Sequence, residues 1–168
     1  LIQAMRIVKS KYENVHFTIL GAIDHENLGA LKQETLDSLL REKLFEYPGY
    51  VSNVEDWITQ TSVFILPSYR EGVPRSTQEA MAIGRPIITT DVPGCRETVI
   101  DGVNGFLVPK WNIQALADKM CYFIEHPEQV NVMGMKSRQI AQEKFDVNRV
   151  NEKLFEIMGL SAENEKVR

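Results

Sequence analysis

Two glutamates, Glu71 and Glu79, have seven residues between them, in a stretch that also contains a glycine and a proline. An ionised carboxylate accepts hydrogen bonds at both oxygens, so it can hold two neighbouring hydroxyl groups. Pro74 lies between the glutamates and suits the start of a helix, because its fixed φ matches the first helical position. The free N–H groups and positive dipole end of a helix N-terminus favour anions, phosphates above all. A sugar nucleotide carries both hydroxyls and phosphates and would suit such a site.

The elements around these residues are predicted to be a strand, a polar loop and a short helix. Residues 63–66 are Val-Phe-Ile-Leu, an apolar run typical of a fully buried strand. Gly84 and Pro86 end the helix that Pro74 begins, which leaves Glu71 in the loop and Glu79 in the second helical turn. A loop at the carboxyl end of a parallel strand, leading into a helix, is where open α/β sheets bind ligands.

Each of these residues also has an ordinary structural interpretation. Glu71 can be a solvated loop charge, and Glu79 an exposed glutamate that favours the N-terminal end of the helix dipole. Gly72 can simply make a turn, although a residue without Cβ also lets the backbone approach a ligand. Arg75 can be a surface charge. The residue types alone leave both interpretations open.

The wider sequence resembles the C-terminal, donor-binding half of retaining GT-B glycosyltransferases of family four. Their E-x7-E motif corresponds to Glu71 and Glu79, with Gly72 after the first glutamate. The similarity continues through residues 80–82 (Ala-Met-Ala), 84–94 with Glu97, and 101–109. The spacing of two glutamates occurs in many helical proteins, and it is the surrounding matches that make the resemblance specific. They cover essentially the whole chain.

The resemblance implies a role for each glutamate. Glu71 would be catalytic, facing the transferred sugar and helping to stabilise developing positive charge. Glu79 would bind the two ribose hydroxyls of the donor. Backbone groups of the loop would line the sugar site, N–H groups at the helix start would meet phosphate, and residues 50–53 would lie around the base. The donor-binding positions expected on this basis are Gly72, Val73, Pro74, Arg75, Ser76, Thr77, Glu79, Tyr50, Val51 and Asn53.

The activity that the resemblance implies is transfer of a hexose or N-acetylhexosamine from a nucleotide sugar, with UDP the expected nucleotide and with retention of configuration. The acceptor would be a glycan or a polyprenyl-diphosphate-linked sugar, as in enzymes that build bacterial polysaccharides. The family's donor half begins with a strand and a loop whose Arg and Lys hold pyrophosphate. This sequence begins after them and without an initiator Met. We therefore expect part of a longer enzyme, lacking the first strand and the N-terminal acceptor domain and inactive alone.

No cofactor or metal is expected besides the donor. The sequence has no Asp-x-Asp triplet, which fits the metal-independent GT-B class. Asp24, His25 and Glu26 are consecutive, and adjacent residues rarely converge on one ion, so a solvated loop is the favoured interpretation. Cys95 has no neighbouring His in the sequence and, with Gly94, is interpreted as part of a turn and cap rather than as a nucleophile.

Other classes of protein share the expected architecture. A nicotinamide site needs G-x-G-x-x-G after the first strand, where Gly21 stands alone, and the P-loop motif is absent. A nucleotide-sugar epimerase or phosphorylase of GT-B type, and a binding module without catalysis, both stay open. The stretches Glu-Gly-Val-Pro-Arg-Ser at 71–76 and Val-Pro-Gly-Cys-Arg-Glu at 92–97 favour transfer over epimerisation.

Length and composition bound the remaining possibilities. The chain has 168 residues, 43% of them hydrophobic, which suffices for one domain over residues 1–160, followed by a charged tail at 161–168. A formal net charge of −4 gives no reason to expect nucleic acid as a partner. Two cysteines, no apolar run as long as a membrane span and no signal peptide favour the cytoplasm. A lipid-linked acceptor adds peripheral association with the inner face of the membrane.

Alternating strand and helix patterns predict an α/β fold with a doubly wound parallel sheet, which the resemblance specifies as the Rossmann-like GT-B type. We expect a helix at residues 2–12, a strand at 15–21, a loop at 24–29, a helix from 31 that ends before Tyr47 and Pro48, a strand at 50–51 and a helix capped by Asn53. This strand end and cap explain Tyr50, Val51 and Asn53 as well as a base site does. After the central unit follow a strand at 87–90, a turn at 93–94, a helix at 96–100, a strand at 105–109 and three helices.

Overall fold

The computed structural model describes residues 1–23 and 31–160. The strands are β1 (Thr18–Leu20), β2 (Glu46–Gly49), β3 (Phe64–Leu66), β4 (Ile87–Thr90) and β5 (Gly105–Val108). The helices are α1 (Ile2–Lys11), α2 (Gln33–Arg41), α3 (Val54–Thr59), α4 (Arg75–Ala82), α5 (Pro93–Arg96), α6 (Ile113–Glu125), α7 (Pro127–Lys144) and α8 (Val147–Ile157). The predicted loop at 24–29, the Asp24-His25-Glu26 run and the tail at 161–168 fall outside the described residues.

Strand pairing confirms the predicted α/β class. Every strand pair in the described part of the chain is parallel: β1 with β2, β3 with β4, and β4 with β5. The strands form two sheets, in the orders β1-β2 and β3-β4-β5, where the sequence predicts one. Hydrophobic patterns identify strands but not which strand edges meet, so this division lies beyond what the sequence indicates.

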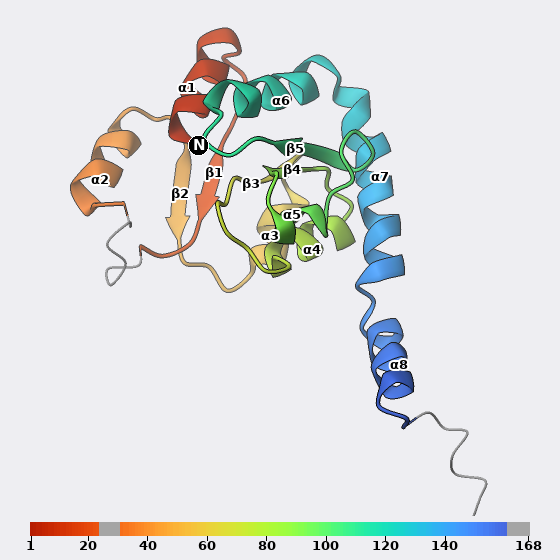
Figure 1. Cartoon of the computed structure of the whole chain (residues 1–168). Helices are drawn as coiled ribbons and strands as arrows, with labels where there is room; N and C mark the ends of the chain where they lie inside the picture. The colour runs from red at the N-terminus through yellow and green to blue at the C-terminus, as the bar shows by residue number, and fades with distance from the viewer. Residues whose placement is uncertain (24–30, 161–168) are drawn as a thin grey trace, which may run out of the picture.

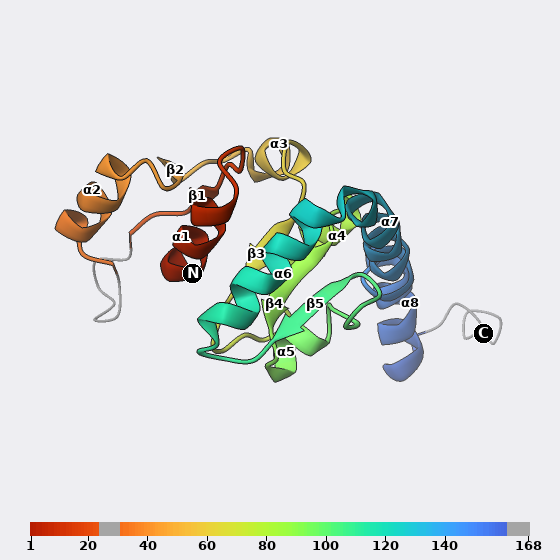
Figure 2. The same ribbon diagram turned by 90° about the horizontal axis from the view of Figure 1, so that it is seen from above.

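Helices cover both faces of the three-stranded sheet, with α6 on one side and α4 on the other (Figures 1 and 2). Side chains alternate between faces along a strand. Ile88 accordingly packs in the larger apolar cluster with α1 and α6, whereas its neighbour Ile87 packs with Ala80 and Met81 of α4. All four residues of β4 are buried, as predicted for this stretch.

The strand predicted at residues 63–66 is present as β3, but the prediction that it is fully buried is wrong. Phe64, Ile65 and Leu66 of β3 are each partly exposed. β3 pairs on one side with β4 and has no partner strand on its other side among the described residues. An apolar sequence that suits the middle of a sheet therefore stands at a sheet edge.

Two short elements differ from the sequence-based expectation. The strand predicted at Tyr50 and Val51 is wrong, because β2 ends at Gly49 and contains Pro48. β2 lies at the edge of its sheet, where a proline is tolerated because no second ladder requires its N–H. The helix predicted at residues 96–100 lies earlier, at α5, and replaces the predicted turn. Pro93 occupies the start of α5, where its fixed φ is favourable.

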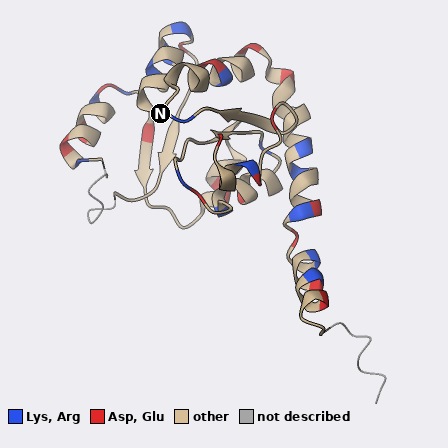
Figure 3. Cartoon of the chain, viewed as in Figure 1, with Lys and Arg blue, Asp and Glu red and all other residues tan. Residues whose placement is uncertain are grey.

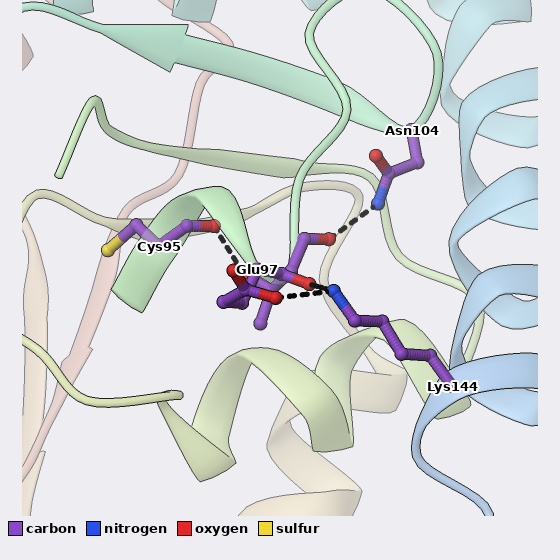
Figure 4. A network of polar contacts seen from close by, with 5 residues as sticks. Cys95, Glu97, Asn104 and Lys144 are labelled. Atoms are coloured by element: carbon purple, nitrogen blue, oxygen red, sulfur yellow. Dashed lines mark hydrogen bonds and ion pairs between the residues drawn. The ribbon is translucent and has the colours of Figure 1, made fainter. Parts of the chain in front are cut away.

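The helix α7 packs against the end of α4 and the segment before β5. A Cβ added at Gly134 of α7 would lie 2.2 Å from the carbonyl oxygen of Gly84, so the glycine permits a backbone contact with the end of α4. The buried Asn104 side chain donates to the Thr98 carbonyl oxygen at 3.0 Å, and Ser137 Oγ of α7 donates to the Asn104 carbonyl oxygen at 3.1 Å. Figure 4 shows this amide beside the segment after α5.

The last described helix, α8, extends away from the body of the molecule (Figure 1). It has no buried residues, and Asp146 caps it by accepting hydrogen bonds from the N–H groups of Asn148 and Arg149. Charges of both signs are interspersed along α7 and α8 (Figure 3). Within the described residues, no helix combines the length and apolar character needed to cross a membrane.

Candidate functional site

An open pocket of about 560 Å³ lies beyond the carboxyl ends of β3, β4 and β5. The loops that follow these three strands contribute its lining. The lining residues are Tyr69, Arg70, Glu71, Gly72, Val92, Pro93 and Lys110. The structure thus brings the predicted Glu71 and Gly72 to the edge of a parallel sheet where ligands bind in such folds.

Two buried threonines of β4 fix the start of the loop that carries Glu71. Thr89 Oγ1 donates to the carbonyl oxygen of Leu66 at 2.7 Å. Thr90 Oγ1 donates in the same way to the carbonyl oxygen of Ser68. Because both hydroxyls are buried, these bonds are shielded from competing water, and the loop leaves the sheet in a defined direction.

Gly94 of α5 contacts the backbone of the same loop. The sequence alone did not indicate it as a site residue. A Cβ added at Gly94 would lie 1.5 Å from the carbonyl oxygen of Gly72 and 2.3 Å from that of Glu71. The absence of a side chain therefore allows α5 to pack directly on the backbone of the candidate site. Only the tertiary structure shows this, since the sequence around Gly94 is equally typical of a simple turn.

Gly72 is in a different environment. A Cβ added there would meet no atom within 4 Å, and the residue is exposed. The folded chain itself does not require a glycine at this position. The backbone at this position is therefore open to the close approach of another molecule.

The start of α4 differs slightly from the prediction. Pro74 is buried and is the N-cap residue, one position before the first helical residue, Arg75. The first bond of the helix runs from the N–H of Gln78 to the Pro74 carbonyl oxygen at 3.2 Å, and no side chain caps the helix. The N–H groups of Arg75, Ser76 and Thr77 precede that bond, so they are the groups that a helix leaves free for an anion.

The side chains along α4 differ in exposure. Val73 before the helix and Arg75 are exposed, Ser76 is half-buried, and Thr77 is fully buried. Thr77 Oγ1 has no hydrogen-bond partner among the described residues. Glu79 is exposed in the second turn, as predicted, and lies outside the lining of the pocket. The structure therefore gathers Glu71 and Gly72 in the pocket, with Glu79 further along the adjoining helix.

The residues predicted around the base lie in the segment that follows the last strand of the other sheet. Tyr50, Val51 and Asn53 belong to the segment between β2 and α3, and Tyr50 is 80% exposed. Asn53 is the N-cap of α3, but its side chain does not cap the helix as expected. Its Nδ2 instead donates to Asp56 Oδ2 at 2.9 Å.

Two ion pairs stabilise the backbone around the pocket. Arg96 of α5 donates to Asp91, and this hydrogen bond holds the pKa of the Asp91 carboxyl below its ordinary value. Lys144 of α7 donates to the Glu97 carboxylate at 2.6 Å and to its carbonyl oxygen at 2.8 Å (Figure 4). The hydrogen bond from Lys144 likewise lowers the pKa of Glu97. The first pair ties the end of α5 to the residue that precedes it by five, and the second ties the same end to α7.

Within residues 1–23 and 31–160, the buried cysteine thiols and the acidic side chains are not grouped into a metal site. Cys95 and Cys121 are both buried and free. In the part of the chain that the structure describes, no three His, Cys, Asp or Glu side chains are grouped as a metal site requires. The chemistry available in the pocket comes from the Glu71 carboxylate, the cations of Arg70 and Lys110, the Tyr69 hydroxyl and backbone groups.

The sequence family described as Glycosyl transferases group 1 matches residues 1–126. The chain belongs to this family. Its fold is that of the C-terminal domain of GT-B glycosyltransferases, as the resemblance implies. Where the family match ends, α6 has just finished, so the match includes every strand and the whole candidate site.

Individual glycosyltransferases are similar over most of the chain. The capsular polysaccharide biosynthesis glycosyltransferase CapM of Staphylococcus aureus is 30% identical over 154 residues, which are 92% of this chain and 40% of CapM. An N,N'-diacetylbacillosaminyl-diphospho-undecaprenol α-1,3-N-acetylgalactosaminyltransferase of Campylobacter jejuni is 30% identical over 67% of this chain and 29% of its own length. The crystal structure of Anabaena Alr3699/HepE in complex with UDP superimposes with a TM-score of 0.83 at 22% identity, over 94% of this chain and 44% of that one. The chain thus spans less than half the length of these relatives.

Proposed function

We propose that this glycosyltransferase domain binds the nucleotide-sugar donor for a transfer that retains anomeric configuration. The observation that supports this most directly is the Glu71–Gly72 loop, which lies at the carboxyl ends of three parallel strands beside the start of α4. The transferred group is a hexose or N-acetylhexosamine. The acceptor is a glycan or a polyprenyl-diphosphate-linked sugar.

In this proposal, the donor extends from the pocket along α4. Glu71 faces the transferred sugar, where its charge stabilises the positive charge that develops in the transition state. Backbone groups of Gly72, Val73 and Pro74 line the sugar site. The free N–H groups of Ser76 and Thr77 bind the diphosphate, assisted by the dipole of α4 and by Arg75.

The nucleoside end of the donor lies further along the same path. Glu79 accepts hydrogen bonds from the two ribose hydroxyls, and Tyr50, Val51 and Asn53 surround the base. Glu79 is five residues beyond Pro74, a rise of roughly 7–8 Å at the helical spacing. Side chains on a helix lean toward its N-terminus, which directs the Glu79 carboxylate back toward the diphosphate.

The known ligands of relatives support the proposed substrate classes. UDP is bound in the structure of Alr3699/HepE, which supports UDP as the nucleotide proposed here. The Campylobacter relative is named for a diphospho-undecaprenol acceptor. No metal is included in the proposed mechanism, because the helix start and the cations beside the pocket supply positive charge to the diphosphate.

Titration of UDP into the chain, followed by amide NMR resonances, tests the donor site. We expect shifts at Gly72, Ser76 and Glu79 at millimolar UDP. Glu79→Ala should abolish this response while the protein stays folded. Glu152→Ala removes another exposed glutamate, from α8, and should leave the response unchanged. Shifts confined to another surface would refute the assignment of the site.

A second experiment, on the full-length enzyme, tests the reaction. Glu71→Gln keeps the shape of the side chain and removes its charge, so it should lower kcat by about 10²–10³-fold with a much smaller effect on the donor KM. The anomeric configuration of the product, determined by NMR, should match that of the donor. Formation of an epimer of the donor, without transfer, would instead support the nucleotide-sugar epimerase alternative.

A further inference from the structure

Two exposed aromatic side chains stack on one another beside the pocket. The rings of Tyr69 and Trp111 have centroids 3.8 Å apart and an interplanar angle of 22°. Tyr69 follows β3 and Trp111 follows β5, and β4 lies between these two strands. The stacked pair therefore joins the first and last loops at the carboxyl edge of the sheet.

This pair is not part of the hydrophobic core. Trp111 is 73% exposed and Tyr69 is 47% exposed. One ring face of each lies against the other, and most of the indole surface remains in contact with solvent. Large aromatic side chains usually bury most of their surface, so an exposed flat pair at the rim of a pocket is typical of a recognition surface.

The backbone under Trp111 is unusual for a bulky residue. The N–H of Asn112 donates to the Pro109 carbonyl oxygen at 3.3 Å and closes a four-residue turn. Trp111 is the third residue of this turn and has a φ of +64°. Glycine is the residue that normally occupies such a position, because a side chain there is strained. Strained residues at exposed positions are concentrated at functional sites, where the side chain is needed for something other than folding.

The chemistry beside the pair indicates what it binds. Tyr69, Glu71 and Lys110 all line the pocket, and Lys110 directly precedes Trp111. A flat aromatic face accepts the C–H bonds on one side of a pyranose ring, while the ammonium group of Lys110 can donate to the hydroxyls at its edge. An apolar surface with a few convergent polar groups is the general form of a small-ligand site.

We propose that Tyr69 and Trp111 form a platform on which a sugar ring of the acceptor glycan stacks. This inference rests on the proposed function, because it takes the donor to occupy the side of the pocket toward α4. Trp111 follows β5, at the other edge of the sheet from β3, so the indole reaches Tyr69 from the β5 side. The pair thereby supplies an acceptor subsite within the donor-binding domain itself.

Fluorescence of a single tryptophan tests this proposal. The chain has two tryptophans, so Trp57→Phe leaves Trp111 as the only one. Into this variant we would titrate N-acetylglucosamine, maltotriose and, separately, uridine. We expect at least one saccharide to change the Trp111 emission with a saturable, millimolar-range curve that uridine does not compete with. Tyr69→Ala in the same background should weaken saccharide binding at least fivefold.

Phe155→Ala is the matched control, because Phe155 is an exposed aromatic on α8, remote from the pocket. It should leave saccharide binding unchanged. The proposal would be refuted if neither saccharide gave a saturable response, or if uridine competed with the saccharide at Trp111. UDP shifts at Gly72 and Glu79 measured on the same sample separate this outcome from failure of the proposed function. If the UDP shifts persist while saccharides do not bind, only the platform is wrong.

Discussion

Gly94→Ala is the substitution with the most direct consequence for the candidate site. The added methyl carbon would lie 1.5 Å from the Gly72 carbonyl oxygen, 2.3 Å from that of Glu71 and 2.5 Å from the Gly72 carbonyl carbon. All three are backbone atoms, so no side-chain rotation relieves the overlap. Real Cβ contacts essentially never fall below 3.0 Å, and α5 and the loop must therefore separate by at least about 1.5 Å.

The cost of this displacement falls on both stability and function. Overpacking of this kind destabilises proteins by about 1–3 kcal/mol. Thr89 holds the start of the loop at Leu66, so the displacement is concentrated at Glu71 and Gly72 themselves. A misplacement of about 1 Å can cost on the order of 10²-fold in rate, and we expect a loss of this size in transfer by the full-length enzyme.

Gly72→Ala is the control, because it adds the same methyl group where no atom lies within 4 Å. Urea unfolding should show Gly94→Ala destabilised by about 1–3 kcal/mol and Gly72→Ala within about 0.5 kcal/mol of the wild type. Amide NMR should show shifts at Glu71 in the Gly94 variant without ligand. A Gly94→Ala protein with wild-type stability and unshifted Glu71 and Gly72 amides would refute the reasoning.

Three further predictions concern the strained turn, an ion pair and the activity of the chain alone. Trp111→Gly should change the unfolding free energy little. Loss of the Tyr69 stack costs about 0.5–1.5 kcal/mol, and relief of the left-handed backbone returns about 1–2 kcal/mol. A thermal melt checks this, and a loss of stability above about 2 kcal/mol would contradict it. Lys144 lowers the pKa of Glu97, so this pair stabilises the fold above the ordinary glutamate pKa of about 4.3 and the effect is lost as pH falls through the lowered folded-state pKa. The difference in stability between wild type and Lys144→Met, measured by urea unfolding, should therefore be present at neutral pH and shrink in acid; a difference that stays constant would exclude the ion pair as its cause. The chain alone should bind UDP weakly and release no sugar onto saccharide acceptors, and transfer detected by product chromatography would disprove this.

Sequence patterns predict correctly those helices and strands that are determined by residues close to them in the chain. Ile87–Thr90 is a strand because an apolar, β-branched run follows Pro86, and α4 ends near Gly84, whose φ is +84°. The strand β2 was misplaced because it is a half-exposed edge strand that contains Pro48. Propensity and hydrophobic pattern are weakest for strands of this kind.

Contacts between distant residues account for the parts of the site that the sequence did not predict. Glu71 and Gly72 could be assigned to a ligand-binding loop from the strand before them and the helix after them. The approach of Gly94 to that loop, and the stacking of Trp111 on Tyr69, depend on which strands are neighbours in the sheet. The helix predicted at residues 96–100 also lies later than the observed α5, because Pro93 favours a helix start as much as the turn predicted there.

The central position of β4 has a consequence for the order in which parts of the molecule unfold. β4 is the only strand within the described residues that is paired on both sides, and all four of its residues are buried. Local unfolding begins where few contacts must be broken, as in α8, which buries no residue. The amide hydrogens of β4 should therefore be among the slowest to exchange with solvent. The loops that form the pocket are anchored to this strand and to its two partners, so unfolding of α8 alone leaves these anchors in place.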